Sequence, residues 1–279
     1  MRNNPWQHAR QSGVADDIDF FIRGEDLQFV EIELDPGESA VAEAGAMVWK
    51  DASVGMTTVF GDGSDADNQS GFMGKLLGAG KRLITGESLF TTVFTHNGHG
   101  KARVAFAAPT PGTILPLKLS DVGGTLICQK DSFLAAAKGV QVGIAFQRKV
   151  MTGLFGGEGF IMQKLTGDGW VFVQMGGTLI ERELAAGEEL HVDTGCVAAF
   201  TAGVDMDVQP VGGGVKSMLF AGEGVFFARL RGPGKVYIQS LPFSRLAARM
   251  MAAAGPVGGD NRGEGSVLGG LGDIVMGNN

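Results

Sequence analysis

The sequence predicts an all-β protein built from three copies of one strand-rich unit, and two observations predict it. The first is a Gly-Glu dipeptide that recurs at Gly86, Gly157 and Gly222, each time before an apolar run, a glycine turn and a second apolar run. The second is the number of glycines, 46 in 279 residues, which lie mostly at predicted turns without a collagen-like period of three. A unit that recurs at near-constant spacing is typical of repeat architectures.

Each Gly-Glu copy is predicted to open a β-hairpin. In the second copy the turn 167–169 separates the runs 160–162 and 170–174. The third copy keeps this spacing around the turn 232–234, and the first has a longer turn at 96–100. Two β-rich runs around a glycine turn are typical of a hairpin.

A second element recurs upstream of each predicted hairpin. Turns at 34–38 and 184–188 are followed by segments of matching spacing, and the turn at 119–124 is one residue longer. Residues 30–34 alternate between apolar and acidic side chains, which is the period of a half-buried strand. The sequence therefore predicts the same strand-turn-strand arrangement in all three units.

These elements divide the chain into six predicted segments. The first unit also contains a glycine-rich insert at 61–85, and Ser244 after Pro242 predicts the start of a short helix. The segments are an N-terminal arm (1–17), three β units (18–107, 108–176 and 177–243), a short helix (244–254) and a flexible glycine-rich tail (255–279).

Charge and hydropathy narrow the classes of protein. The net charge of −7 argues against a nucleic-acid surface, which needs a basic stripe. No uninterrupted apolar stretch approaches the roughly 18 residues that span a bilayer, and residues 1–17 lack the apolar core of a signal peptide. The sequence predicts a cytoplasmic protein of bacterial type, with Cys128 and Cys196 as buried reduced thiols.

Four sequence motifs occur in order along the chain: Gly-Glu-Ser-Leu-Phe (86–90), Gly-Glu-Gly-Phe (157–160), Gly-Glu-Gly-Val-Phe (222–226) and Gly-Pro-Gly-Lys-Val-Tyr-Ile-Gln-Ser (232–240). Their sequences and their order resemble those of the altered-inheritance-of-mitochondria protein 24 family. The resemblance covers roughly residues 20–243. It implies three tandem units in a pseudo-threefold arrangement, each similar to the subunit of the tryptophan RNA-binding attenuator protein, a short double-stranded β-helix or sandwich. Fungal relatives are tied to organisation and biogenesis of the mitochondrial inner membrane, and the family supplies no catalytic residues.

The glutamates of the three copies, Glu87, Glu158 and Glu223, are the most conspicuous polar residues of the repeat. One interpretation is a ring of carboxylates that binds a cation. The other is a structural pairing of each glutamate with a backbone turn or a nearby basic residue. Repetition across units favours the structural interpretation.

The second half of the insert combines apolar and basic residues. Such a mixture indicates a short amphipathic element that contacts a membrane surface or a partner, although a flap packed on its own subunit is the more ordinary interpretation. The candidate contact residues are Phe72, Met73, Leu76, Leu77, Lys81 and Arg82.

Two histidines, His96 and His99, lie across one predicted turn and form half of a candidate metal site. An exposed turn without a metal is the favoured interpretation. No nucleophile motif and no paired acid and base stand out, so the sequence favours a protein that is not an enzyme and has no cofactor.

Two functional hypotheses remain. The first is a non-enzymatic scaffold or interaction protein that forms a homo-oligomer and contacts a protein partner or, as a membrane-peripheral protein, a membrane surface. The alternative is a cupin-like module, or an enzyme, that binds a small ligand or metal in clefts between the β units. RNA binding by analogy with the attenuator protein is the least favoured, because the net charge opposes it.

Overall fold

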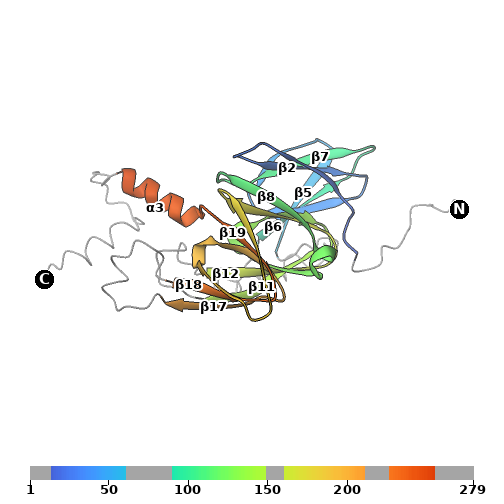
Figure 1. Cartoon of the computed structure of the whole chain (residues 1–279). Coiled ribbons are helices and arrows are strands. Elements are labelled where there is room, and N and C mark those ends of the chain that lie inside the picture. The colour runs from blue at the N-terminus through green and yellow to red at the C-terminus, as the bar shows by residue number, and fades with distance from the viewer. Residues whose placement is uncertain (1–13, 61–89, 149–159, 211–225, 255–279) are drawn as a thin grey trace. The chain divides into compact units, whose positions relative to one another are not determined.

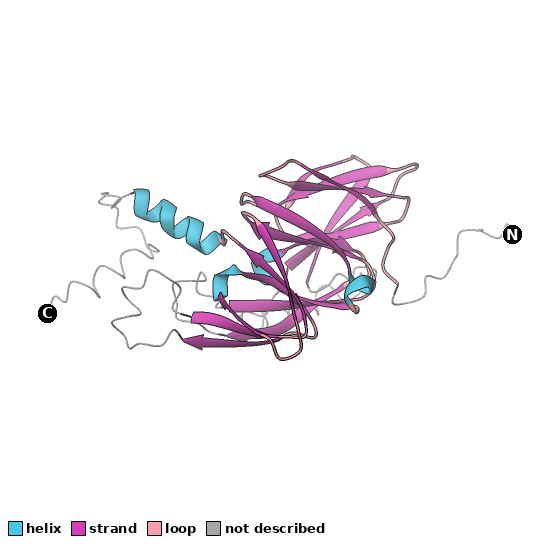
Figure 2. Ribbon diagram, in the orientation of Figure 1, coloured by secondary structure: helices cyan, strands magenta, loops and turns pink. Residues whose placement is uncertain are grey.

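The structure, a computed structural model, describes residues 14–60, 90–148, 160–210 and 226–254, and strands account for most of them (Figures 1 and 2). The strands form four antiparallel sheets, which confirms the all-β prediction. The chain divides into two compact units, Met1–Arg245 and Leu246–Asn279, and the sheets lie in the first. The helix α3, Phe243–Ala254, begins one residue before the predicted short helix.

The sheets are numbered 1 to 4 here, and each is given in its order of neighbouring strands. Sheet 1 is β1 (Asp19–Arg23), β2 (Phe29–Leu34), β7 (Ala102–Ala107) and β4 (Met47–Lys50). Sheet 2 is β5 (Val54–Phe60), β6 (Phe90–His96), β3 (Ser39–Glu43), β10 (Phe133–Ala137), β13 (Trp170–Gly176) and β8 (Gly112–Lys118). Sheet 3 is β11 (Gln141–Arg148), β12 (Phe160–Thr166), β9 (Thr125–Gln129), β16 (Val197–Thr201), β19 (Gly234–Gln239) and β14 (Leu179–Leu184). Sheet 4 is β15 (Glu189–Asp193), β18 (Phe226–Arg231) and β17 (Asp205–Pro210).

Sheets 2 and 3 have the same strand order, and each strand of sheet 3 has a number six higher than its counterpart in sheet 2. The neighbours β3 and β10 of sheet 2, for example, correspond to the neighbours β9 and β16 of sheet 3. Sheet 1 contains β2, β7 and β4, the counterparts of one half of sheet 2. Sheet 4 contains the counterparts of the other half. Each six-stranded sheet is therefore completed by two successive stretches of chain, whereas sheets 1 and 4 are halves.

The same irregularity marks three corresponding strands. The pairing of β4 with β7 shifts register between Met47 and Trp49, and β10 shifts against β13 between Phe133 and Ala135. The strand β16 shifts against β19 after Val197. A bulge inserts one extra residue and bends the strand. Its recurrence fixes which residues of β4, β10 and β16 correspond.

The predicted hairpins after each Gly-Glu form strands, but the predicted pairing within them is wrong. The strands β6 and β7 pair with different neighbours and lie in different sheets, as do β12 and β13, and β18 and β19. The reason lies in the turn. In the third copy, Gly232 exchanges backbone hydrogen bonds with the turn at 185–188, namely Gly187 N–H to Gly232 O and Gly232 N–H to Glu188 O. A Cβ at Gly232 would lie 2.4 Å from the Ala185 carbonyl oxygen, so glycine permits this contact between turns.

The true hairpins are β5 with β6, β11 with β12, and β17 with β18. Their connecting segments, 61–89, 149–159 and 211–225, lie outside the described residues. The three Gly-Glu copies fall in these segments, each shortly before the second strand of a hairpin. The division into three β units stays a prediction.

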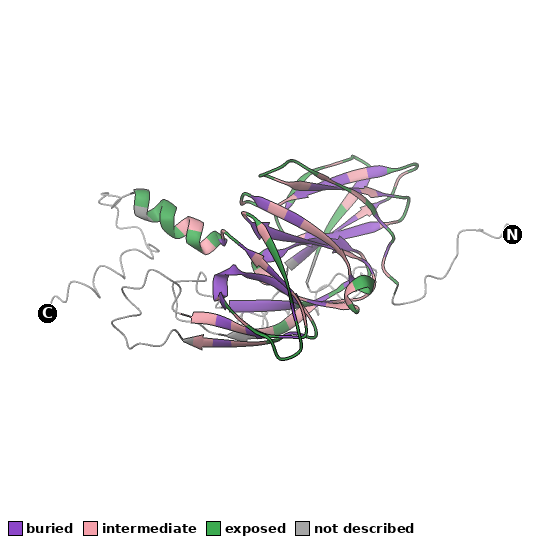
Figure 3. Cartoon of the chain, viewed as in Figure 1, coloured by how far each residue is buried: buried purple, intermediate pink, exposed green. Residues whose placement is uncertain are grey.

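Burial follows the strands (Figure 3). The alternation predicted for residues 30–34 is confirmed, because Val30, Ile32 and Leu34 have no exposed surface and belong to one core cluster. On the other face of β2, Arg103 donates to Glu31 and Glu33, and Lys101 donates to Glu33. The hydrogen bonds from Lys101 and Arg103 lower the pKa of the Glu33 carboxyl. Both cysteines, Cys128 and Cys196, are buried and neither forms a disulfide bond, as predicted.

A buried glutamine connects successive stretches of chain. Gln239, on β19, accepts a hydrogen bond from Gly176 N–H at 2.9 Å and donates to Gly195 O at 2.9 Å and to Gln129 at 3.2 Å. Its counterpart on β13, Gln174, is buried too, but its Oε1 atom has no partner among the described residues and its donor contacts are long, at 3.4 and 3.5 Å. The two glutamines thus occupy equivalent positions with unequal hydrogen bonding.

Replacing Gln239 by leucine is expected to destabilise the fold by roughly 1–3 kcal/mol, because Gly176 N–H and Gly195 O lose buried partners. The matched control is Gln174→Leu, which removes an unsatisfied oxygen and should cost clearly less. The measurement is the free energy of unfolding from denaturant titration. Equal losses in the two variants would contradict this assignment.

Candidate interaction surface

The strand β4 is an unpaired edge with apolar side chains. Met47, Val48 and Trp49 have 38%, 56% and 37% of their surface exposed, and among the described strands β4 has a neighbour, β7, on one side only. The corresponding strands β10 and β16 are buried almost throughout, because β3 and β9 pair with their other edges. The apolar edge that is covered in sheets 2 and 3 is therefore open in sheet 1.

The strand β15 is the opposite open edge. Its counterparts β3 and β9 each have neighbours on both sides, whereas β15 pairs only with β18 among the described strands. Glu189 and His191 are exposed, while Val192 is buried and Leu190 is partly buried against the same core cluster. The strand thus presents a polar face, an apolar face and a free backbone edge.

Three of the other outer strands, β14, β8 and β17, carry residues that usually protect a sheet edge. The strand β14 has Glu181, Arg182 and Glu183 in succession, β8 contains Pro116, and β17 ends at Pro210. Charged side chains and proline on an edge prevent pairing with another chain. The exposed residues of β4 are uncharged, as are those of the outer strand β5. What distinguishes β4 is that its counterparts β10 and β16 are covered by β3 and β9, whereas the counterparts of β5 are outer strands too.

Glu43, at the end of β3, is a partly buried carboxyl beside the contact of β3 with β10. Burial, together with the negative charge of Asp131, raises the pKa of Glu43 to about 7, and the positive charge of Lys130 opposes the shift. The corresponding residue of β9 is Gln129, a neutral side chain bonded to Gln239. The same burial, with the charge of Glu43, raises the pKa of the Cys128 thiol, which disfavours the nucleophilic thiolate.

The histidine pair is not symmetric. The prediction of an exposed turn is wrong for His96, which is fully buried, and holds for His99, which is exposed. Gly98 N–H donates to Nδ1 of His96 at 3.3 Å, so Nε2 carries the proton and donates to Gly100 O at 2.9 Å. In this conformation both ring nitrogens of His96 hold their own loop together and neither is available to a metal ion.

The remaining predicted site residues lie outside the described residues. This applies to the repeat glutamates Glu87, Glu158 and Glu223, and to the candidate contact residues Phe72, Met73, Leu76, Leu77, Lys81 and Arg82. Their roles stay predictions. Across the described ranges, no three His, Cys, Asp or Glu side chains are grouped so as to hold a metal ion, and no helix is long and apolar enough to cross a membrane.

Sequence reasoning missed the β4 edge. Residues 47–49 are as apolar as their counterparts 133–135 and 197–199, so hydropathy marks all three segments as core. Only the sheet order shows that β4 lacks a neighbour. One signal was visible: Trp49 stands where the corresponding strands have Ala135 and Ala199, and so large a difference in volume indicates different surroundings.

Glu43→Gln is expected to change the pH dependence of stability. With a folded-state pKa raised from 4.5 to about 7, the carboxyl favours folding below pH 4.5, and this contribution is lost as the pH rises through 7. The variant should therefore be more stable than the wild type at pH 8, on the order of 1–3 kcal/mol, and similar near pH 4. Denaturant titrations at both pH values measure this. A pH-independent difference would contradict the buried carboxyl as its source.

Three comparisons with known proteins agree with one another. The family model described as mitochondrial biogenesis AIM24 matches residues 20–241. An uncharacterised protein of Streptococcus pyogenes serotype M6 is 32% identical over 246 residues, covering 86% of this chain and 93% of that protein. The crystal structure of another Streptococcus pyogenes protein has the same fold, with a TM-score of 0.66 at 24% identity, covering 85% of this chain and 99% of that one. The resemblance predicted from the sequence is thereby confirmed: the chain belongs to the mitochondrial biogenesis AIM24 family.

Proposed function

We propose that the protein is a non-enzymatic assembly protein that binds a protein partner through the open edge of sheet 1. The observation that supports this proposal is the exposure of Met47, Val48 and Trp49 on β4, whereas the corresponding residues of β10 and β16 are buried. A strand edge of this kind binds by β-augmentation, in which main-chain hydrogen bonds supply affinity and alternate side chains supply specificity.

Both parts of this interaction are available on β4. Its outer edge presents backbone N–H and C=O groups to a further strand, since β7 occupies only the inner edge. Covering the three partly exposed apolar side chains would contribute on the order of 1 kcal/mol each, in addition to the main-chain bonds. Leaving the edge open exposes three apolar side chains on an unpaired strand edge, a combination that favours aggregation.

The proposal predicts that β4 is covered in the cell. The test compares how fast a Val48→Cys variant reacts with a thiol-specific maleimide in two preparations, a native lysate and a dilute solution of the purified, folded protein. The reaction should be slower in the lysate. The matched control is Ile180→Cys, on the charged edge strand β14, where the native side chain is 43% exposed. Labelling at that position should be equal in both preparations. The native thiols Cys128 and Cys196 are buried and contribute little background.

Labelling is followed by mass spectrometry of the full-length chain. The proposal predicts protection at position 48 and none at position 180. Equal labelling of position 48 in lysate and in dilute solution would contradict a partner on β4.

A further inference from the structure

We infer that the partner strand is β15 of a second copy of this chain, which adds to β4 and completes a sheet of the kind seen in sheets 2 and 3. This inference rests on the proposed function and names the occupant of the β4 edge. In sheets 2 and 3 the central pairs are β3 with β10 and β9 with β16. The strand β15 corresponds to β3 and β9, and β4 corresponds to β10 and β16, so the two open strands are the two partners of such a pair. Within the chain, the described strands β4 and β15 lie in separate sheets and do not pair.

Two strand pairs within the chain, β3 with β10 and β9 with β16, are the internal junctions. Their registers give the register expected for β15 with β4 of another chain. In the first, Ala42 of β3 pairs with Ala135 of β10, and in the second, Cys128 of β9 pairs with Ala199 of β16. The recurring bulge places Trp49 at the position of Ala135 and Ala199. The corresponding residue of β15 is Val192. The antiparallel register therefore sets Val192 opposite Trp49, His191 opposite Lys50 and Leu190 opposite Asp51.

This register places Trp49 against the face of β15 that packs on the core. In its own sheet Trp49 lies beside Ala105 and Glu31, on the face that points away from the core cluster of β2 and β7. Trp49 lies opposite Val192 and diagonal to Leu190, both of which belong to or pack on one core cluster. The internal junctions have buried pairs at this position, with Ala42, Ala135, Cys128 and Ala199 all fully buried. Trp49 is larger than these alanines, so the junction between chains is built around one larger side chain.

The register also matches charges on the other face. Lys50 lies opposite His191, and its diagonal neighbours along β15 are Glu189 and Asp193. Diagonal neighbours lie about 7–8 Å apart, within reach of a lysine side chain. In this register the single basic residue of β4 would lie within reach of both carboxylates of β15. Within one chain Lys50 donates to Val54 O, and the two carboxylates pair with Arg229 and Arg245, so Lys50 would add to these pairs. A register shifted by one residue would set Lys50 against the apolar face.

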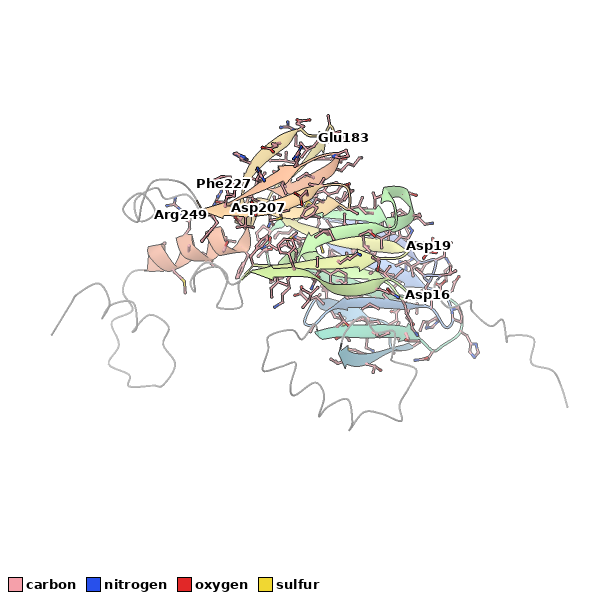
Figure 4. The ribbon with its side chains drawn as sticks, turned by 90° about the horizontal axis from the view of Figure 1, so that it is seen from below. Asp16, Asp19, Glu183, Asp207, Phe227 and Arg249 are labelled. Atoms are coloured by element: carbon pink, nitrogen blue, oxygen red, sulfur yellow. The ribbon has the colours of Figure 1, made fainter. Side chains whose placement is uncertain are left out.

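The two edges are different surfaces, so the contact is head to tail. Sheet 1, with β2 and β7, and sheet 4, with β17 and β18, lie at opposite ends of the β body (Figure 1). Asp19 of β1 and the neighbouring Asp207 and Phe227 of β17 and β18 mark these ends (Figure 4). Each copy therefore keeps one free edge after binding another. A heterologous contact of this kind generates a ring or a filament and excludes an isologous two-fold dimer through β4.

Disulfide trapping tests the register directly in the purified full-length protein, because directly opposite Cα atoms in a sheet are about 4.5–5.5 Å apart, within disulfide range. The variants are Lys50→Cys and His191→Cys, with oxidised glutathione as the oxidant. A mixture of the two single variants should give a covalent dimer, and the double variant should give a ladder of covalent multimers. Each single variant alone should stay uncrosslinked.

Three outcomes would overturn the inference. One is crosslinking of a single variant with itself, which would indicate an isologous contact. Another is a disulfide confined to one chain of the double variant, which would mean that β15 closes on β4 of the same copy. The third is the absence of any crosslink.

A second pair of variants tests the assembly without cysteine chemistry. Val48→Lys places a charge on the β4 edge and should raise the protein concentration needed for assembly at least about tenfold, equivalent to 1.4 kcal/mol. The matched control, Ile180→Lys on β14, should leave assembly unchanged. Light scattering after gel filtration gives the mass, and circular dichroism confirms that both variants fold. A purified wild-type chain that stays monomeric would overturn the inference. Protection of position 48 in a lysate would then still support the proposed function with a different partner.

Discussion

The structure depends on pairing between sheet halves contributed by successive stretches of chain. Buried backbone N–H and C=O groups must be satisfied, and each half on its own would leave its junction strand unpaired along one edge. The pairing of β3 with β10, and of β9 with β16, satisfies that edge twice within the chain. The same requirement recurs at both ends of the β body, where β4 and β15 have no neighbour among the described strands.

This constraint explains several local features. The strands β10 and β16 are rich in alanine because they are covered on both edges and both faces, whereas β4, at the same position, carries Trp49. Gln239 lies where three stretches of chain meet and bonds to each of its neighbours. A charged group at such a location is destabilising, as Glu43 illustrates: its carboxyl is largely buried beside the junction of β3 with β10, and its pKa rises to about 7. Polar groups at these junctions are therefore stabilising only where they are neutral and paired.

Much of the fold could be predicted from the sequence. The all-β class, the alternation at residues 30–34 and the buried thiols depend on local pattern, and local pattern determines them. Strand pairing could not be predicted, because the glycine turn at 232–234 bonds to the turn at 185–188 instead of closing its own hairpin. The burial of His96 was missed for a similar reason, since its ring bonds to its own loop. The open edge at β4 is a property of sheet order, and hydropathy alone carries no information on it.

The central claim is that β15 of one chain pairs with β4 of the next, and site-resolved amide hydrogen exchange tests it most directly. Exchange is compared between the wild type at assembling concentration and the same protein after dilution. The account predicts that amides of β4 and β15 become faster together on dilution, while those of the edge strand β14 do not change. Fast exchange of β4 and β15 at every concentration, or slowing of only one of the two strands, would contradict it.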